Sequence, residues 1–330
     1  MRKDIGRIHS RRAMLHLGIR TAAGAGLLGS LESITGATAN AGEGRQDRAL
    51  VCVYLFGGVG EAHLISTGGA LHPAAAELHA LRQSGALRVV PLPAAPAGRS
   101  DGAQSHPEIM ARRYASLRFL PNGFATPEWA ARAAGLEGHH GAGAYTFQSG
   151  MSLVIPGGPP RGGRQFAKTG LRQAMEDARP LAAAFPNSAL GRQMEDVSRL
   201  LRAAGRLELS RPVFLCAATG FTESARQAGM LAGRYRELSQ AIAAFQAATV
   251  ELGLERRVTT YTDGESHEAA KAQRARIVLG GAAFGGAIAD EFNPAAGHYH
   301  ASIASWLGLP AARVKQAFPE FAVSRSWMQA

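Results

Sequence analysis

Asp263 and three histidines are the side chains of this sequence best suited to hold a divalent cation. Asp263 comes directly after the segment 257–262, which predicts a strand. The histidines, whose segments can reach the same edge of a sheet, are His63, His106 and His267. Carboxylate and imidazole groups are ligands for Zn²⁺ and related ions, so the four form a candidate metal site, with Asp263 and His106 as the candidate catalytic groups. The alternative interpretation is that they are surface loop residues.

A second candidate site consists of basic side chains. Arg226, Lys271 and Arg276 fall near the same strand ends and put fixed positive charge there. Because guanidinium groups offer a planar fork to phosphate, sulfate or carboxylate, these residues are candidates for binding an anion without a metal. A solvated basic face is the alternative.

Other potentially reactive residues fit no motif. No serine lies in a Gly-x-Ser-x-Gly elbow, and no dinucleotide fingerprint follows a strand. His298 and His300 have a metal-like spacing for a strand, but this segment predicts the start of a helix, where positions i and i+2 do not face each other. Cys52 and Cys216 lie in apolar runs and are interpreted as buried, inert thiols, with a disulfide between them as the alternative.

Apolar runs alternate with amphipathic segments, which predicts an α/β fold. The expected class is a three-layer, doubly wound, mainly parallel sheet, because several runs are apolar throughout. Expected strands are 50–56, 88–92, 152–155, 212–218, 257–262 and 275–280. Expected helices are 72–84, 106–118, 127–135, 188–204, 223–252 and 300–307. Segments 93–104 and 156–170, rich in Gly, Pro and Ala, are expected loops.

Residues 1–41 resemble a twin-arginine signal peptide. Arg11 and Arg12 precede a weakly apolar run, and an Ala-Asn-Ala cleavage site ends at Ala41. The expectation is therefore export to the periplasm, with residues 42–330 forming a single α/β domain. A basic N-terminus on a cytosolic protein is the alternative.

The amino-acid composition and charge of the chain argue against several classes of protein. The chain of 330 residues is 46% hydrophobic and 18% charged, which is typical of a globular protein. Its net charge is +11, but no Lys/Arg block or aromatic stripe predicts a nucleic-acid surface. No stretch of about 18 residues after the signal is apolar enough to predict a transmembrane segment.

A series of short motifs in fixed order resembles the twin-arginine-exported family called domain of unknown function 1501, which is similar to alkaline phosphatases and sulfatases. The motifs are LFGGVGE at 55–61, LHPA at 71–74, QSHPE at 104–108, LGRQM at 190–194 and GFTESARQ at 220–227. The resemblance covers almost all of residues 42–330 and implies an alkaline-phosphatase-like fold with a metal site at the strand ends.

The same resemblance implies that this metal site is degenerate. The positions that carry Asp or His in the family are Gly60, Thr222, Ser224, Ala269 and Ala270 here, and a following histidine position is Arg276. Glycine and alanine have no donor atom, and neutral hydroxyls replace carboxylates poorly.

The function hypothesis is therefore a non-catalytic, exported binding or scaffold protein. It would have no cofactor, and its partner would be a protein of the envelope or a small anion. The alternative is a metal-dependent hydrolase of phosphate or sulfate esters that uses the rearranged site around Asp263, and only this alternative implies a divalent metal.

Overall fold

A computed structural model describes the residues that build a sheet and the helices around it. The described residues are 48–57, 63–66, 69–92, 117–119, 125–127, 130–131, 144–155, 164–204, 207, 209, 211–221, 228–264, 274–281 and 296–318. Residues 1–41, and with them the predicted signal peptide, lie outside this part of the chain. Within it, no helix has the length and apolar character needed to cross a membrane.

The main sheet has seven strands in the order β2-β9-β8-β1-β7-β6-β5, and β3 pairs with β4 separately. The strands are β1 (Ala49–Leu55), β2 (Leu87–Leu92), β3 (Leu117–Phe119), β4 (Ala125–Pro127), β5 (Ala144–Thr146), β6 (Ser152–Val154), β7 (Val213–Ala218), β8 (Val258–Gly264) and β9 (Arg274–Gly280). All six strands expected from the apolar runs are present. The three that were not expected, β3, β4 and β5, are each three residues long.

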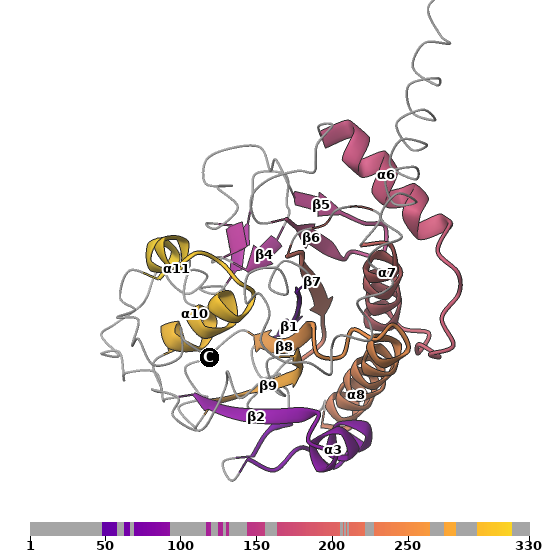
Figure 1. Cartoon of the computed structure of the whole chain (residues 1–330). Helices are drawn as coiled ribbons and strands as arrows, with labels where there is room; N and C mark the ends of the chain where they lie inside the picture. Colours follow the sequence, from indigo (N-terminus) through magenta and orange to yellow (C-terminus); the bar gives the residue numbers. More distant parts are fainter. Residues whose placement is uncertain are drawn as a thin grey trace, which may run out of the picture.

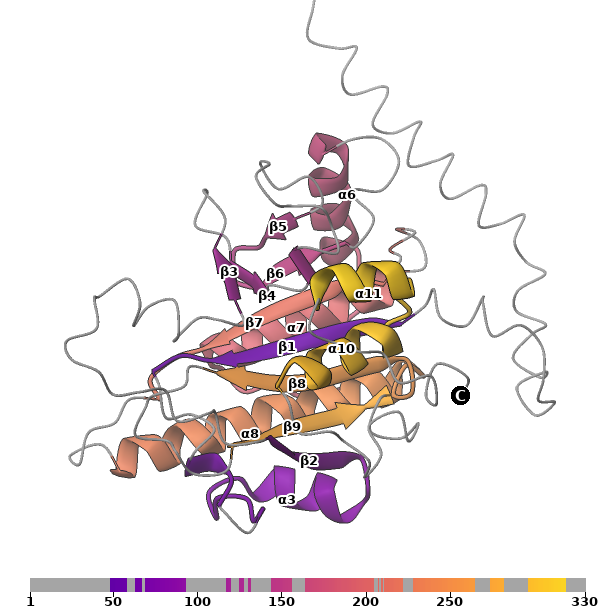
Figure 2. The same ribbon diagram turned by 90° about the vertical axis from the view of Figure 1, so that its left-hand side faces the viewer.

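Helices cover both faces of this sheet. They are α3 (Ala76–Gln83), α6 (Arg164–Glu176), α7 (Ala189–Ala203), α8 (Ala228–Glu251), α10 (Ala296–Trp306) and α11 (Ala311–Ala317). Figure 1 shows α3, α7 and α8 on one side of the strands and α10 and α11 on the other. In Figure 2 the strands β7, β1, β8 and β9 lie side by side behind α10 and α11.

The prediction of a mainly parallel sheet is wrong. Only β7 and β8, the two neighbours of β1, run parallel to it; the other four neighbouring pairs are antiparallel. Apolar strands buried on both faces look alike in either direction, so the composition of the strands could not decide this. One signal was available, because the nine residues at 265–273 between β8 and β9 are too few for the crossover that parallel neighbours need.

The helix expectations also need correction. The segment 156–170 was expected to be a loop, but α6 begins at Arg164, where the glycine and proline run gives way to helix-forming residues. Helix α11 was not expected. The expected helix at 106–118 lies outside the described residues except for its last two positions, which begin β3. Of the expected helix at 127–135, residues 130–131 are helical, whereas position 127 ends β4.

Strand β1 divides the core into two halves. Its residues Val51, Val53 and Leu55 pack with α3, α7 and α8. The alternate residues Leu50, Cys52 and Tyr54 pack with α10 and α11. This alternation follows from the two-residue period of a strand, and every residue of β1 is buried.

The two cysteines lie on opposite faces of the sheet. Cys52 belongs to the core half under α10, and Cys216 on the neighbouring strand β7 belongs to the half under α7 and α8. Both are free and buried, and burial raises the pKa of each thiol well above its usual range. Side chains that point to opposite faces cannot form a disulfide without backbone movement.

Gln193 completes the hydrogen bonding of β7 beyond the point where β6 ends. Strand β6 pairs with β7 only as far as Leu215. At Ala217 the Gln193 side chain takes over: its Nε2 donates to the Ala217 carbonyl at 3.0 Å, and its Oε1 accepts from the Ala217 amide at 2.8 Å. The buried Gln193 side chain therefore makes the two hydrogen bonds that a neighbouring strand would make with Ala217.

Replacing Gln193 by leucine should lower the free energy of unfolding by about 2–4 kcal/mol, because two buried backbone groups lose their partner. Urea denaturation followed by circular dichroism measures this change. The matched control is Gln173→Leu on the exposed side of α6, which should stay within about 0.5 kcal/mol of wild type. Equal costs at the two positions would show that the Gln193 contacts contribute nothing special.

Candidate functional site

Asp263 lies near the carboxyl end of β8, at the edge where the three parallel strands β8, β1 and β7 all end. In the sheet it is paired with Tyr54 of β1. Strand β9 runs antiparallel to β8, so its first residues come to the same edge. The beginning of α10 passes over this edge from the helical layer above. In open α/β sheets ligands bind outside the carboxyl ends of the parallel strands, which makes this edge the natural place for a site.

Three charged or titratable side chains from three elements meet here. Asp263 Oδ1 lies 2.6 Å from Nη1 of Arg276 on β9. The other carboxylate oxygen, Oδ2, lies 3.1 Å from Nε2 of His300 on α10. The Gly264 amide also donates to Oδ1 at 2.7 Å. We call Asp263, Arg276 and His300 the strand-end triad.

The ion pair of the strand-end triad is almost completely removed from solvent, whereas the His300 side chain is 14% exposed. Asp263 is 1% exposed and Arg276 is 6% exposed. Burial by itself raises the pKa of Asp263, but the Arg276 charge, the hydrogen bond and charge of His300 and the Gly264 amide outweigh burial and lower the pKa to about 2. Asp263 is therefore a carboxylate at neutral pH, and its charge is compensated inside the protein.

Aromatic side chains and Cys52 surround the strand-end triad on the same face of the sheet. The Tyr261 ring meets the His300 ring edge-on at 6.2 Å between centroids, and Tyr54 packs on Phe56 at 4.6 Å. Burial raises the pKa of the Cys52 thiol, and the nearby Asp263 charge raises it further. A thiol in this position is a packing group rather than a nucleophile.

The described residues at this edge do not fit a divalent metal. A cation bound by Asp263 would have to share a carboxylate whose two oxygens already contact Arg276 and His300. The buried guanidinium would also repel it. In the part of the chain that the structure describes, no three His, Cys, Asp or Glu side chains are grouped as a metal site requires. His63, the one candidate histidine ligand in that part, is exposed.

The structure joins two residues that the sequence interpretation had assigned to different sites. Asp263 was a candidate metal ligand and Arg276 a candidate anion-binding residue, yet they form one ion pair. The other candidates lie outside the described residues, and their roles stay predictions: His106, His267, Arg226 and Lys271, together with the family positions Gly60, Thr222, Ser224, Ala269 and Ala270.

His300 is the member of the strand-end triad that sequence reasoning missed. The helix was expected, but positions i and i+2 of a helix do not face each other, so the spacing of His298 and His300 gave no reason to single out His300. The useful signal was the spacing to the following residues: Ile303, Ala304 and Leu307 lie three, four and seven positions later and pack against the sheet. A polar residue at the start of such a stripe faces the same way.

The loops after β1 and β7 lie side by side at this edge. The Phe56 amide donates to the Ala218 carbonyl at 2.8 Å, and the Phe221 amide donates to the Phe56 carbonyl at 3.1 Å. Gly57 has a φ of +130°, and a Cβ added there would lie 2.9 Å from the Phe221 amide nitrogen. Backbone hydrogen bonds thus join the two segments that lead to the family positions Gly60 and Thr222.

Comparisons with known protein families, with curated proteins and with solved structures find no match to this chain. The structure itself defines the class as an α/β protein whose seven-stranded mixed sheet is flanked by helices. Within that class, the site is a buried carboxylate whose two oxygens are both held by the protein's own cationic or hydrogen-bonding groups.

Proposed function

We propose that this chain is an exported, alkaline-phosphatase-like protein whose metal site has degenerated and which acts by binding rather than by catalysis. The observation that carries the proposal is the buried ion pair at 2.6 Å between Asp263 and Arg276. The Arg276 guanidinium gives Asp263 the positive charge that a metal ion would give a carboxylate ligand in a metal-dependent hydrolase. The export part is tested by cell fractionation of a variant with Arg11→Lys and Arg12→Lys, which should stay in the cytoplasm.

Because the charge of Asp263 is compensated within the protein, this edge of the sheet is poorly suited to metal-dependent catalysis. Metal-dependent hydrolysis of phosphate or sulfate esters needs carboxylates and imidazoles that face an open coordination position. In the strand-end triad the negative charge of Asp263 is matched from within, and hydrogen bonds hold the group in place. Such a cluster stabilises one arrangement of α10 on the sheet, which suits a rigid binding surface.

Between the two kinds of partner, we favour a protein of the envelope over a small anion at this edge. An anion that approached Arg276 would compete with Asp263, which is already in contact with it and is even more deeply buried. The anion interpretation then depends on Arg226 and Lys271 without help from Arg276.

A hydrolysis assay tests the non-catalytic proposal against the hydrolase alternative. The exported chain is incubated with p-nitrophenyl phosphate and p-nitrophenyl sulfate in the presence of Zn²⁺, Mn²⁺, Mg²⁺ or Ca²⁺. We expect no more product than with heat-unfolded protein.

Turnover that follows the folded protein through size-exclusion chromatography and falls at least about a hundredfold in His300→Gln would support the hydrolase instead. The control is Glu237→Gln, a residue of an exposed ion pair with Arg234 on α8.

A further inference from the structure

A cavity lies on the opposite side of the sheet from the strand-end triad, between α6, α7 and the β5–β6 hairpin. Its volume is about 580 Å³, and its walls include Tyr145, Phe147, Leu171, Met175 and Asp196. A cavity of this size holds a small organic molecule. None of these residues belongs to the strand-end triad, so nothing argued for the proposed function explains the cavity.

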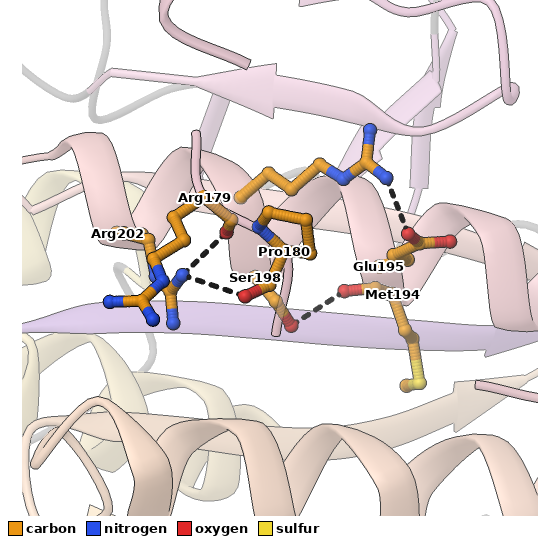
Figure 3. A network of polar contacts seen from close by, with 7 residues as sticks. Arg179, Pro180, Met194, Glu195, Ser198 and Arg202 are labelled. Atoms are coloured by element: carbon orange, nitrogen blue, oxygen red, sulfur yellow. Dashed lines mark hydrogen bonds and ion pairs between the residues drawn. The ribbon is translucent and has the colours of Figure 1, made fainter. Parts of the chain in front are cut away.

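The two helical walls of this cavity are held in place by polar contacts. Arg202 of α7 donates to the carbonyls of Arg179 and Pro180, which follow α6 (Figure 3). Its Nη2 also lies 2.8 Å from Oε1 of Glu251, and the Ala182 amide donates to Oε2 of the same carboxylate. The segment after α6 is thereby fastened to both α7 and α8, and the cavity is formed before any ligand arrives.

The cavity has one partly desolvated acid. Asp196 is half-buried, and burial raises its pKa despite the nearby Ser149 hydroxyl and the charge of Arg199. Arg199 does not compensate this carboxylate fully, since its Nη2 pairs with Oε1 of Glu195 at 2.6 Å. A ligand that carried positive charge to Asp196 would relieve the cost of its burial.

Besides Asp196 and Arg199, two charged side chains of the lining are exposed. Arg172 and Glu176 line the cavity from α6, but both are exposed, so solvent screens them. Part of the wall is apolar and aromatic, with Tyr145 and Leu171 buried and Phe147 and Met175 half-buried, and Thr146 and Gln148 add polar groups. Aromatic faces and a thioether accept both hydrocarbon groups and organic cations.

We propose that this cavity binds a small organic cation, an amine with an apolar or aromatic body, whose ammonium group pairs with Asp196 while its body packs on Phe147, Leu171 and Met175. The carboxylate gives the preference for positive charge, and the apolar wall gives the preference for a hydrophobic body. This site is independent of the proposed function of the strand-end triad.

Isothermal titration of the full chain with three probes of similar size tests the proposal. The probes are 2-phenylethylammonium, neutral 2-phenylethanol and anionic 3-phenylpropionate. The cation should bind saturably, about tenfold or more tighter than the alcohol, and the anion should bind least. In Asp196→Asn the preference for the cation should fall below about threefold.

The matched control is Glu176→Gln, which removes the same charge from an exposed side chain of the same cavity and should leave the preference within about twofold. Near-ultraviolet circular dichroism verifies that both variants are folded, and Asp196→Ser replaces Asp196→Asn if the latter is not. The proposal is overturned if the wild type does not bind the cation, if the alcohol or the anion binds as tightly, or if Asp196→Asn keeps the full preference.

Discussion

Replacing Asp263 by alanine is expected to lower the free energy of unfolding by about 3–5 kcal/mol. The variant leaves the Arg276 guanidinium buried beside β8 without the carboxylate that compensates its charge. It also removes the acceptor of the His300 hydrogen bond, which links α10 to the sheet. Equilibrium denaturation in urea, with far-ultraviolet circular dichroism as the signal, measures the loss.

The double variant Asp263→Leu/Arg276→Met distinguishes a buried charge from lost packing. Because it removes both charges together and keeps apolar volume, it should recover most of the stability lost in Asp263→Ala. The exposed pair of Arg234 and Glu237 serves as the control, and Glu237→Ala should cost less than about 1 kcal/mol. A cost below about 1 kcal/mol for Asp263→Ala would mean that the strand-end triad is not an electrostatic unit.

Replacing Gly57 by alanine should destabilise the protein by about 3–4 kcal/mol. Its φ of +130° is a conformation that residues with a side chain rarely adopt. A Cβ there would also lie 2.9 Å from the Phe221 amide nitrogen and closer still to the Phe221 carbonyl group. The loops after β1 and β7 would have to separate at the edge where the strand-end triad lies. Thermal and urea unfolding both report this cost.

Two glycine controls separate backbone conformation from overlap. Gly85 has a φ of +76°, but a Cβ added there would meet no atom within 4 Å, so Gly85→Ala should cost only about 1 kcal/mol. Gly229 lies in α8 with open space around it, and Gly229→Ala should stabilise by about 0.5–1 kcal/mol. If Gly57→Ala costs no more than Gly85→Ala, the close approach to Phe221 is not what requires glycine.

The core strands could be predicted from the sequence because a strand that is buried on both faces is apolar at most positions. The run around Cys52 is apolar at every position, and β1 is buried at every position. Strand direction leaves no such pattern, so the parallel sheet was a wrong expectation that only the short β8–β9 connection could have corrected. Strands β3 to β5 are too short to produce a periodic pattern.

The candidate site was partly predictable for a different reason. Asp263 could be placed because it lies at the end of the predicted strand 257–262, and ligand-binding side chains gather at strand ends. Its pairing with Arg276 could not, since that contact depends on β9 running antiparallel to β8 and bringing its first residues to the same edge. To predict the role of His300, one must know which face of α10 packs on the sheet. The apolar stripe of the helix shows this face, and His300 lies at the start of that stripe.

The most direct test of the central claim is the metal content of the exported chain, purified without chelators and measured by mass spectrometry. We predict no stoichiometric divalent ion, because the guanidinium of Arg276 and the ring of His300 hold both oxygens of Asp263. One ion per chain, lost in Asp263→Asn and retained in the control Glu237→Gln, would contradict the claim and restore the hydrolase alternative.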